Sequence, residues 1–208
     1  MADVDPIQAQ LIAARRNQIL DAATQVFAEK GFDRATIHDV AKAAHVADGT
    51  IYNYFDNKTA VLLGILDRLN ATSQREADFQ QAVHSDIHQW LQSYIQQRLE
   101  SLTPAAYQVF RVLFSEVLVN TELRDRYFAE IIQPTFDTAT NSYEQWVANG
   151  TIKPLDPALT MRVFAASVIG LVLLRLMGDT ELQTRWNELP AVITEILLKG
   201  LEKGVTNE

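Results

Sequence analysis

The chain has 208 residues, which is enough for one compact domain or for two small ones that share a core. Apolar residues make up 48% and charged residues 21%, so a disordered, collagen-like or low-complexity chain is excluded. The absence of cysteine excludes disulfides, thiolate metal sites and a cysteine nucleophile.

The hydropathy of the chain predicts neither a signal peptide nor a membrane span. The N-terminus is acidic and polar, whereas a signal peptide is basic and then apolar. The longest strongly apolar stretch, Val163 to Leu174, has about twelve residues, and a membrane helix needs roughly 18 to 20. We therefore expect a soluble, cytoplasmic protein with no membrane partner. The formal net charge of −8 argues mildly against a nucleic-acid partner, because phosphate groups attract Lys and Arg.

The pattern is that of an all-α protein of about nine helices, since no stretch alternates apolar and polar residues as a half-buried strand would. The N-terminal part predicts one long helix, which could begin as early as Pro6 and ends at Gly31. Thr36 is the expected N-cap of the next helix. Residues 45–47 leave room only for a very tight turn between two short helices. These three helices are expected over about 14–30, 37–44 and 48–55.

Longer and more apolar helices fill the rest of the chain. Pro134 must bend the helix that contains it, because proline has no N–H to donate. Neither an internal repeat nor a flexible linker is visible, so we expect a domain over 1–60 and a larger one over 61–208. A continuous helix over 57–83 is expected to connect them. The further helices are predicted over about 87–102, 103–118, 121–148, 156–177 and 188–203.

Two short helices that are joined by a tight turn and packed on a longer one form a helix-turn-helix. Gly49 removes a side chain where a DNA backbone could approach closely. The second short helix has apolar anchors on one face, which are Val46, Ile51 and Phe55. Hydroxyls and amides, the groups that contact phosphates and base edges, lie on the other face, at Thr50, Tyr52, Asn53 and Tyr54. The spacing alone fits equally well a helical corner whose tyrosines shield a small core.

The stretch from Ile19 to Leu66 contains F-x-x-K-G-F-x-x-x-T-I, then D-V-A-K-A-A-x-V, then G-T-I-Y-N-Y-F-x-x-K. These motifs resemble the N-terminal domain of TetR-family transcriptional regulators; the rest of the chain matches only in helical layout and length. The resemblance implies a homodimer that binds a pseudo-palindromic operator in double-stranded DNA, with one recognition helix per half-site.

The resemblance also implies a role for each matching residue. Thr36 would cap its helix and touch a phosphate, and Lys58 would pair with another phosphate. Arg15 and Arg16 resemble a basic arm, although solvated surface charge explains them equally well. The expected DNA-contacting residues are Thr36, Gly49, Thr50, Tyr52, Asn53, Tyr54 and Lys58, of which Thr50 and Tyr52 would enter the major groove.

Several residues depart from the family pattern. Asp48 stands where Lys, Ser or Ala is usual, His45 fills a turn position usually given to Gly, and Asp56 replaces a common Lys. Residues 1–60 contain six Lys and Arg against eight Asp and Glu, so this part is acidic. We expect helix N-termini and hydroxyls to make much of the phosphate contact, with a shallow salt dependence. The alternative is a helical effector-binding or scaffolding protein that has lost DNA binding.

The larger predicted domain is rich in aromatic residues, which at helical spacing form a core more often than a ligand site. The resemblance nevertheless implies a small effector. From the aromatic residues we expect it to be apolar or aromatic and to release the DNA when it binds. The expected lining residues are Trp90, Tyr94, Tyr107, Phe110, Phe114 and Tyr127. The two helices nearest the C-terminus should pair with those of a second copy as a four-helix bundle, through Val168, Leu171, Val172, Ile193, Ile196 and Leu197.

His84 and His88 have the i, i+4 spacing of metal ligands on one helix face. Ser85 or Asp86 fits a helix N-cap, however, which would leave His84 outside the helix. We therefore predict no metal and no cofactor. No convergent acid, base or nucleophile is visible, so the sequence predicts no enzyme. It favours an effector-responsive, DNA-binding repressor.

Overall fold

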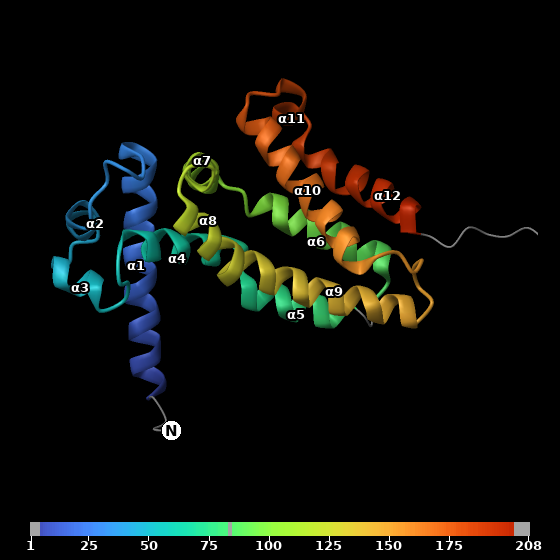
Figure 1. The fold of residues 1–208 in the computed structure, drawn as a ribbon, viewed down its shortest axis with the longest axis horizontal. Coiled ribbons are helices and arrows are strands. Elements are labelled where there is room, and N and C mark those ends of the chain that lie inside the picture. The colour runs from blue at the N-terminus through green and yellow to red at the C-terminus, as the bar shows by residue number, and fades with distance from the viewer. Residues whose placement is uncertain (1–4, 83–84, 202–208) are drawn as a thin grey trace, which may run out of the picture. The chain divides into compact units, whose positions relative to one another are not determined.

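A computed structural model describes residues 5–82 and 85–201, and within them it contains twelve α-helices, two short segments of other helical types and no strand (Figure 1). This confirms the all-α class. The chain divides into two compact units, the first made of residues up to 70 and of 103–127, the second of 71–102 and of the residues from 128 onward.

The first unit begins with α1 (Pro6–Lys30), α2 (Ile37–Ala43), α3 (Asp48–Tyr52) and α4 (Lys58–Asn70). It also contains α7 (Pro104–Val117) and α8 (Thr121–Tyr127), which belong to the larger predicted domain by sequence. Asp5 caps α1, and Gly31 ends it with a φ of +77°, a backbone conformation that favours glycine. Fully enclosed side chains on all six of these helices form the core, among them Leu20, Phe27, Val40, Ile51, Leu62, Leu113 and Leu123.

The second unit contains α5 (Thr72–Ala82), α6 (Ile87–Glu100), α9 (Gln133–Ala148), α10 (Pro157–Leu176), α11 (Thr180–Thr184) and α12 (Leu189–Leu201). A π-helical turn over Phe128–Ile132 precedes α9, and a 3-10 turn over Trp186–Glu188 precedes α12. The core of this unit is aromatic and aliphatic, with Phe79, Ala139, Tyr143, Trp146, Met161 and Leu201 buried together. The Tyr143 hydroxyl donates to the Lys153 carbonyl and accepts from the Leu155 N–H, so the buried phenol is fully bonded.

Two predicted helical stretches differ from the structure, and one helix is additional. The continuous helix expected over 57–83 is two helices, because Ala71 adopts a left-handed φ of +49° between α4 and α5. The helix expected over 121–148 is α8, the π-helical turn and α9; Pro134 has no N–H for the carbonyl four residues back, and the wider turn lies just before it. The short α11 was not predicted at all.

Helix α10 also corrects the expectation about apolar length. Its most apolar 18-residue window has a mean hydropathy of 1.9, so this 20-residue helix is long and apolar enough to cross a membrane by length and composition only. The sequence expectation was based on the uninterrupted apolar run that begins at Val163. The helix also includes Arg162 and the residues before it, and its mean hydropathy remains high. Only 11% of its most apolar window is buried by the rest of the chain.

Candidate nucleic-acid interface

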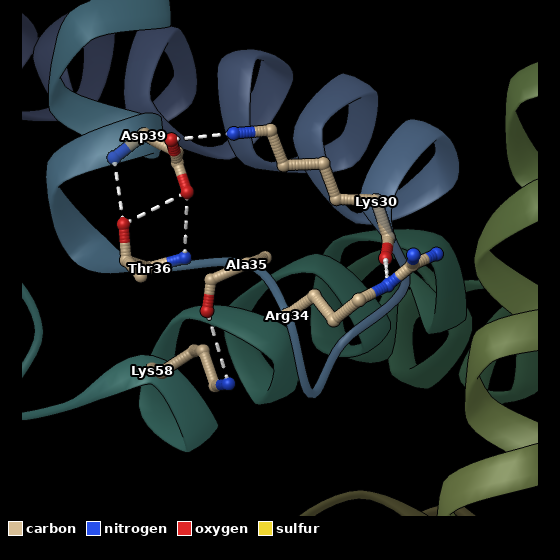
Figure 2. A network of polar contacts seen from close by, with 6 residues as sticks. All are labelled: Lys30, Arg34, Ala35, Thr36, Asp39 and Lys58. Atoms are coloured by element: carbon tan, nitrogen blue, oxygen red, sulfur yellow. Dashed lines mark hydrogen bonds and ion pairs between the residues drawn. The ribbon is translucent and has the colours of Figure 1, made fainter.

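The start of α2 is fixed by a capping box. The Thr36 hydroxyl accepts from the Asp39 N–H at 3.1 Å, and the Asp39 carboxylate accepts from the Thr36 N–H at 3.0 Å. The Lys30 ammonium group lies 2.6 Å from the same carboxylate and so ties the end of α1 to the start of α2 (Figure 2). Hydrogen bonds from Lys30 and then from Thr36 lower the pKa of Asp39 to about 2. The prediction that Thr36 is the N-cap is confirmed.

A tight turn joins α2 to α3. His45 has a left-handed φ of +53°, a conformation that histidine tolerates better than most residues. The Val46 N–H donates to the Ala41 carbonyl at 3.0 Å and closes the turn. Helix α3 is shorter than the expected 48–55: it ends at Tyr52, and Asn53 and Tyr54 form a turn instead.

The two faces of α3 differ in the way that DNA contact requires. Ile51 is fully buried and Phe55, just beyond the helix, is 5% exposed, so both anchor the unit. Tyr52 is 56% exposed, Asn53 is exposed and Thr50 is half-buried. We call Thr50, Tyr52 and Asn53 the reading surface. Tyr54 is half-buried. Among the described residues, none has a heavy atom within 4 Å of the Cβ position of Gly49, so no contact with them requires glycine there.

The Phe55 ring is held from two sides. A Cβ on Gly64 of α4 would lie 2.8 Å from the ring, so glycine allows the close approach of α4 to the end of the helix-turn-helix. The Arg16 guanidinium lies 5.3 Å from the ring centroid. Arg16 therefore packs against the core, whereas the exposed Arg15 donates to Gln18 on its own helix.

Lys58 differs from its expected role. Its ammonium group donates to the backbone carbonyls of Phe32 at 2.6 Å, Asp33 at 3.2 Å and Ala35 at 3.1 Å. These three bonds use all three N–H donors of a lysine. In this structure Lys58 is therefore bonded inside the protein and not directed outward to a phosphate.

Asp48, the acidic departure from the family pattern, has a partner that the sequence did not reveal. Its carboxylate lies 3.1 Å from Nδ1 of His38 on α2, and both side chains are exposed. The two residues are ten positions apart and meet only because the turn brings α2 against α3. Asp48 also lies in the first turn of α3, where the helix dipole favours a negative charge.

Two family models match the chain. The first, described as bacterial regulatory proteins of the tetR family, matches residues 19–65. The second, the C-terminal domain of AefR-like transcriptional repressors, matches residues 89–197, more than half of the chain. This chain belongs to the TetR family. It is a DNA-binding transcriptional repressor, and the prediction from the N-terminal motifs is confirmed.

Similar proteins agree with this membership of the TetR family. The HTH-type transcriptional regulator YhgD of Bacillus subtilis (strain 168) is 30% identical over 167 residues, which cover 76% of this chain and 82% of YhgD. The fatty acid degradation regulator FadR from Bacillus halodurans is 26% identical, with a TM-score of 0.73 over 89% of this chain and 99% of FadR. FadR from Bacillus subtilis, solved with stearoyl-CoA, is 25% identical, with a TM-score of 0.66 over 89% and 98% of the two chains.

The aromatic residues expected to bind an effector of this TetR-family protein divide between the two units. In the second unit, the Trp90 and Tyr94 rings stack with their centroids 5.0 Å apart and pack against Phe79. Burial raises the pKa of Tyr94, while Arg75 and Arg98 lower it. In the first unit, the Phe110 and Phe114 rings of α7 stack with their centroids 6.1 Å apart. The other two expected residues of this unit are Tyr107 on α7 and Tyr127 on α8. Their role in effector binding stays a prediction.

The residues expected at the dimer interface of the TetR fold lie on α10 and α12 with different exposures. Val172 and Ile193 are buried within the chain, Ile196 is 66% exposed, and Val168, Leu171 and Leu197 are half-buried. The structure adds exposed apolar residues that the sequence did not single out, namely Leu159, Val163, Ile169, Leu173, Leu174 and Met177.

His84 and His88, for which we predicted no metal site, are only partly covered by the described residues. His84 lies outside the described residues. Asp86 is the N-cap of α6 and accepts from the Gln89 N–H at 2.9 Å, which confirms one of the two expected caps. Among the residues that the structure describes, no three His, Asp or Glu side chains gather closely enough to hold a metal ion.

Proposed function

We propose that this repressor is a cytoplasmic homodimer that binds a pseudo-palindromic operator and is released from it by a small apolar or aromatic effector. The observation that carries the DNA-binding part is the two-sided environment of α3. Ile51 is fully enclosed, and Tyr52, the next residue, is 56% exposed together with hydroxyl and amide neighbours. A short helix that is anchored on one side and polar on the other fits a major groove.

The acidic charge of the first unit shapes how it would hold DNA. Lys58 is bonded to carbonyls and Asp48 adds a negative charge beside the reading surface. We therefore expect hydroxyl and amide groups to carry much of the contact, with few ion pairs. The number of released counterions sets the salt dependence, so log Kd should change little with log salt.

The apolar surface of α10 and α12 supports the homodimer. Leu159, Val163 and Met177 on α10 are 64%, 59% and 75% exposed, and Ile196 on α12 is 66% exposed. Soluble monomers rarely leave so many large apolar side chains in contact with water. A second copy that covers the same face would satisfy both chains by two-fold symmetry, and it would place two copies of α3 for the two half-sites.

The effector is proposed to contact aromatic side chains within one unit, such as Tyr94 in the second unit or Phe110 in the first. FadR from Bacillus subtilis, which shares 25% of its residues with this chain, was solved with stearoyl-CoA, a ligand with a long apolar chain. An apolar or aromatic molecule suits rings that stack in pairs on α6 and α7. Such a ligand can release DNA only if it binds the two conformations of the repressor unequally; a tenfold effect requires about 1.4 kcal/mol.

A mobility-shift assay with DNA fragments from the region upstream of the protein's own gene tests this proposal. We expect one retarded complex in a mobility-shift assay, with two subunits per operator by light scattering, and footprints on two half-sites. Acyl-CoA thioesters and aromatic acids, added in turn, should include a class that releases the DNA. A monomer at micromolar concentration, or no preference for any upstream fragment over random DNA, would refute the proposal.

A further inference from the structure

The loop between α1 and α2 folds around one ammonium group. Lys58, the first residue of α4, reaches back 26, 25 and 23 positions to the carbonyls of Phe32, Asp33 and Ala35. The same ammonium group lies 4.4 Å from the centroid of the Phe32 ring. Phe32 and Ala35 are 5% and 2% exposed, so their carbonyls lie in a region where little else can donate to them.

The residues that follow this loop begin the helix-turn-helix. Ala35 directly precedes the capping residue Thr36, and Asp39 of the capping box pairs with Lys30 at the end of α1. Arg34, which lies between Asp33 and Ala35, donates to the Lys30 carbonyl at 3.0 Å. Figure 2 shows the consequence: the start of α2 is held by Lys30 from α1 and, through Ala35, by Lys58 from α4.

One charged group near Lys58 is mostly buried. Glu116 on α7 is 9% exposed; burial raises its pKa, Asp33 adds to the rise and Lys58 opposes it. Lys58 is thus within electrostatic reach of a mostly buried carboxyl on α7 and of the loop carbonyls. An ammonium group that leaves this environment for a phosphate must give up three hydrogen bonds and a ring contact.

We propose that Lys58 is a positioning residue for DNA recognition, which fixes the start of α2, and through it the reading surface, instead of contacting a phosphate. The convergence of three loop carbonyls on its ammonium group carries this inference. A phosphate ligand and a positioning residue both lower DNA affinity when they are removed, but they differ in three measurable ways.

The first difference is in salt dependence and specificity. We expect Lys58→Met to weaken operator binding at least tenfold, to leave random-DNA binding within about twofold, and to keep the slope of log Kd against log salt. A phosphate contact would instead weaken both kinds of DNA similarly and reduce the slope by about 0.9. Lys42→Met is the matched control, because it removes the same charge from an exposed position on α2.

The second difference is the response to arginine. A planar guanidinium cannot direct three donors to the three carbonyls as an ammonium group does, yet it binds phosphate at least as well as lysine. Lys58→Arg should therefore also lose operator specificity if Lys58 positions the loop. Retained operator affinity in Lys58→Arg would overturn the inference. If Lys58→Met fails to fold, Lys58→Arg makes the same comparison.

The third difference needs no DNA. In the free protein, hydrogen exchange over residues 31–39 should be at least fivefold faster in Lys58→Met than in the wild type and unchanged in Lys42→Met. Unchanged exchange in Lys58→Met would overturn the inference. The inference rests on the proposed use of α3 to read DNA. Wild-type protein without operator preference would refute that proposal, while the exchange measurement would still decide the role of Lys58 in the loop.

Discussion

Tyr52 and Ile51 are neighbours on opposite faces of α3, so their alanine variants separate DNA contact from folding. Tyr52 is 56% exposed. A tyrosine that is fully enclosed buries about 200 Å². Less than half of that, about 90 Å², is available here, which at about 25 cal/mol per Å² sets an upper limit near 2 kcal/mol. Alanine retains part of this contact and favours the helix by about 0.5 kcal/mol, so we expect Tyr52→Ala to cost about 1 kcal/mol of folding stability.

Ile51 is fully buried, and its truncation should cost about 2–5 kcal/mol of the free energy of unfolding. The loss of operator affinity should be larger for Tyr52→Ala than for Ile51→Ala when both variants are measured below their melting temperatures. Tyr52→Ala should weaken operator binding by about 1–3 kcal/mol, which is roughly 5- to 150-fold. Fluorescence anisotropy with a labelled operator and urea titration measure the two quantities. The reasoning fails if Tyr52→Ala destabilises the protein as much as Ile51→Ala, or if it leaves operator affinity unchanged.

Further predictions concern charge, acid stability and assembly. Hydrogen bonds hold the pKa of Asp39 at about 2 in the folded protein. An unfolded Asp has a pKa of about 3.9, so the carboxylate stabilises the fold above that pH and loses this effect as the pH falls toward 2. The urea midpoint of Asp39→Asn should therefore change less than that of the wild type over this range, and a parallel pH profile would contradict the assignment. Asp48→Lys should tighten binding to operator and to random DNA alike, at a cost of about 0.3–1 kcal/mol in helix-dipole stabilisation. Unchanged affinity for random DNA would place Asp48 away from the backbone. Ile196→Arg should turn dimers into monomers in light scattering with an unchanged melt of the subunit, whereas the exposed Asn141→Arg on α9 should stay dimeric; a dimeric Ile196→Arg would exclude this face.

The local architecture of the helix-turn-helix was readable from the sequence because its signals act over a few residues. Thr36 caps α2 because its hydroxyl reaches an N–H three positions on, and His45 turns the chain because its own backbone allows the left-handed conformation. Gly31 ends α1 for the same local reason. The buried and exposed faces of α3 followed from its residue types, because apolar Ile51 was expected to be buried and Tyr52 to be exposed.

The breaks in the longer helices had weaker local signals. Ala71 is a strong helix former by propensity, and nothing in its identity announces the left-handed conformation that separates α4 from α5. Pro134 predicted a bend in its helix. The structure instead has a π-helical turn over Phe128–Ile132, just before the proline. Propensity describes an isolated helix, whereas the contacts that a helix makes with the rest of its own unit also decide where it ends.

The role of Lys58 depended entirely on tertiary structure. A lysine at the start of a helix beside a helix-turn-helix has the same sequence signature whether it binds a phosphate or a loop. Its three carbonyl partners lie 23 to 26 positions earlier and converge only after α1, α2 and α4 have packed together. The same holds for the face of α10: the sequence shows that its residues are apolar, but only the packed chain shows which of them, such as Leu159 and Met177, it leaves uncovered. Contacts between distant segments depend on how the whole core packs. The periodicity of a short stretch of sequence reports only on that stretch, so it does not predict these contacts.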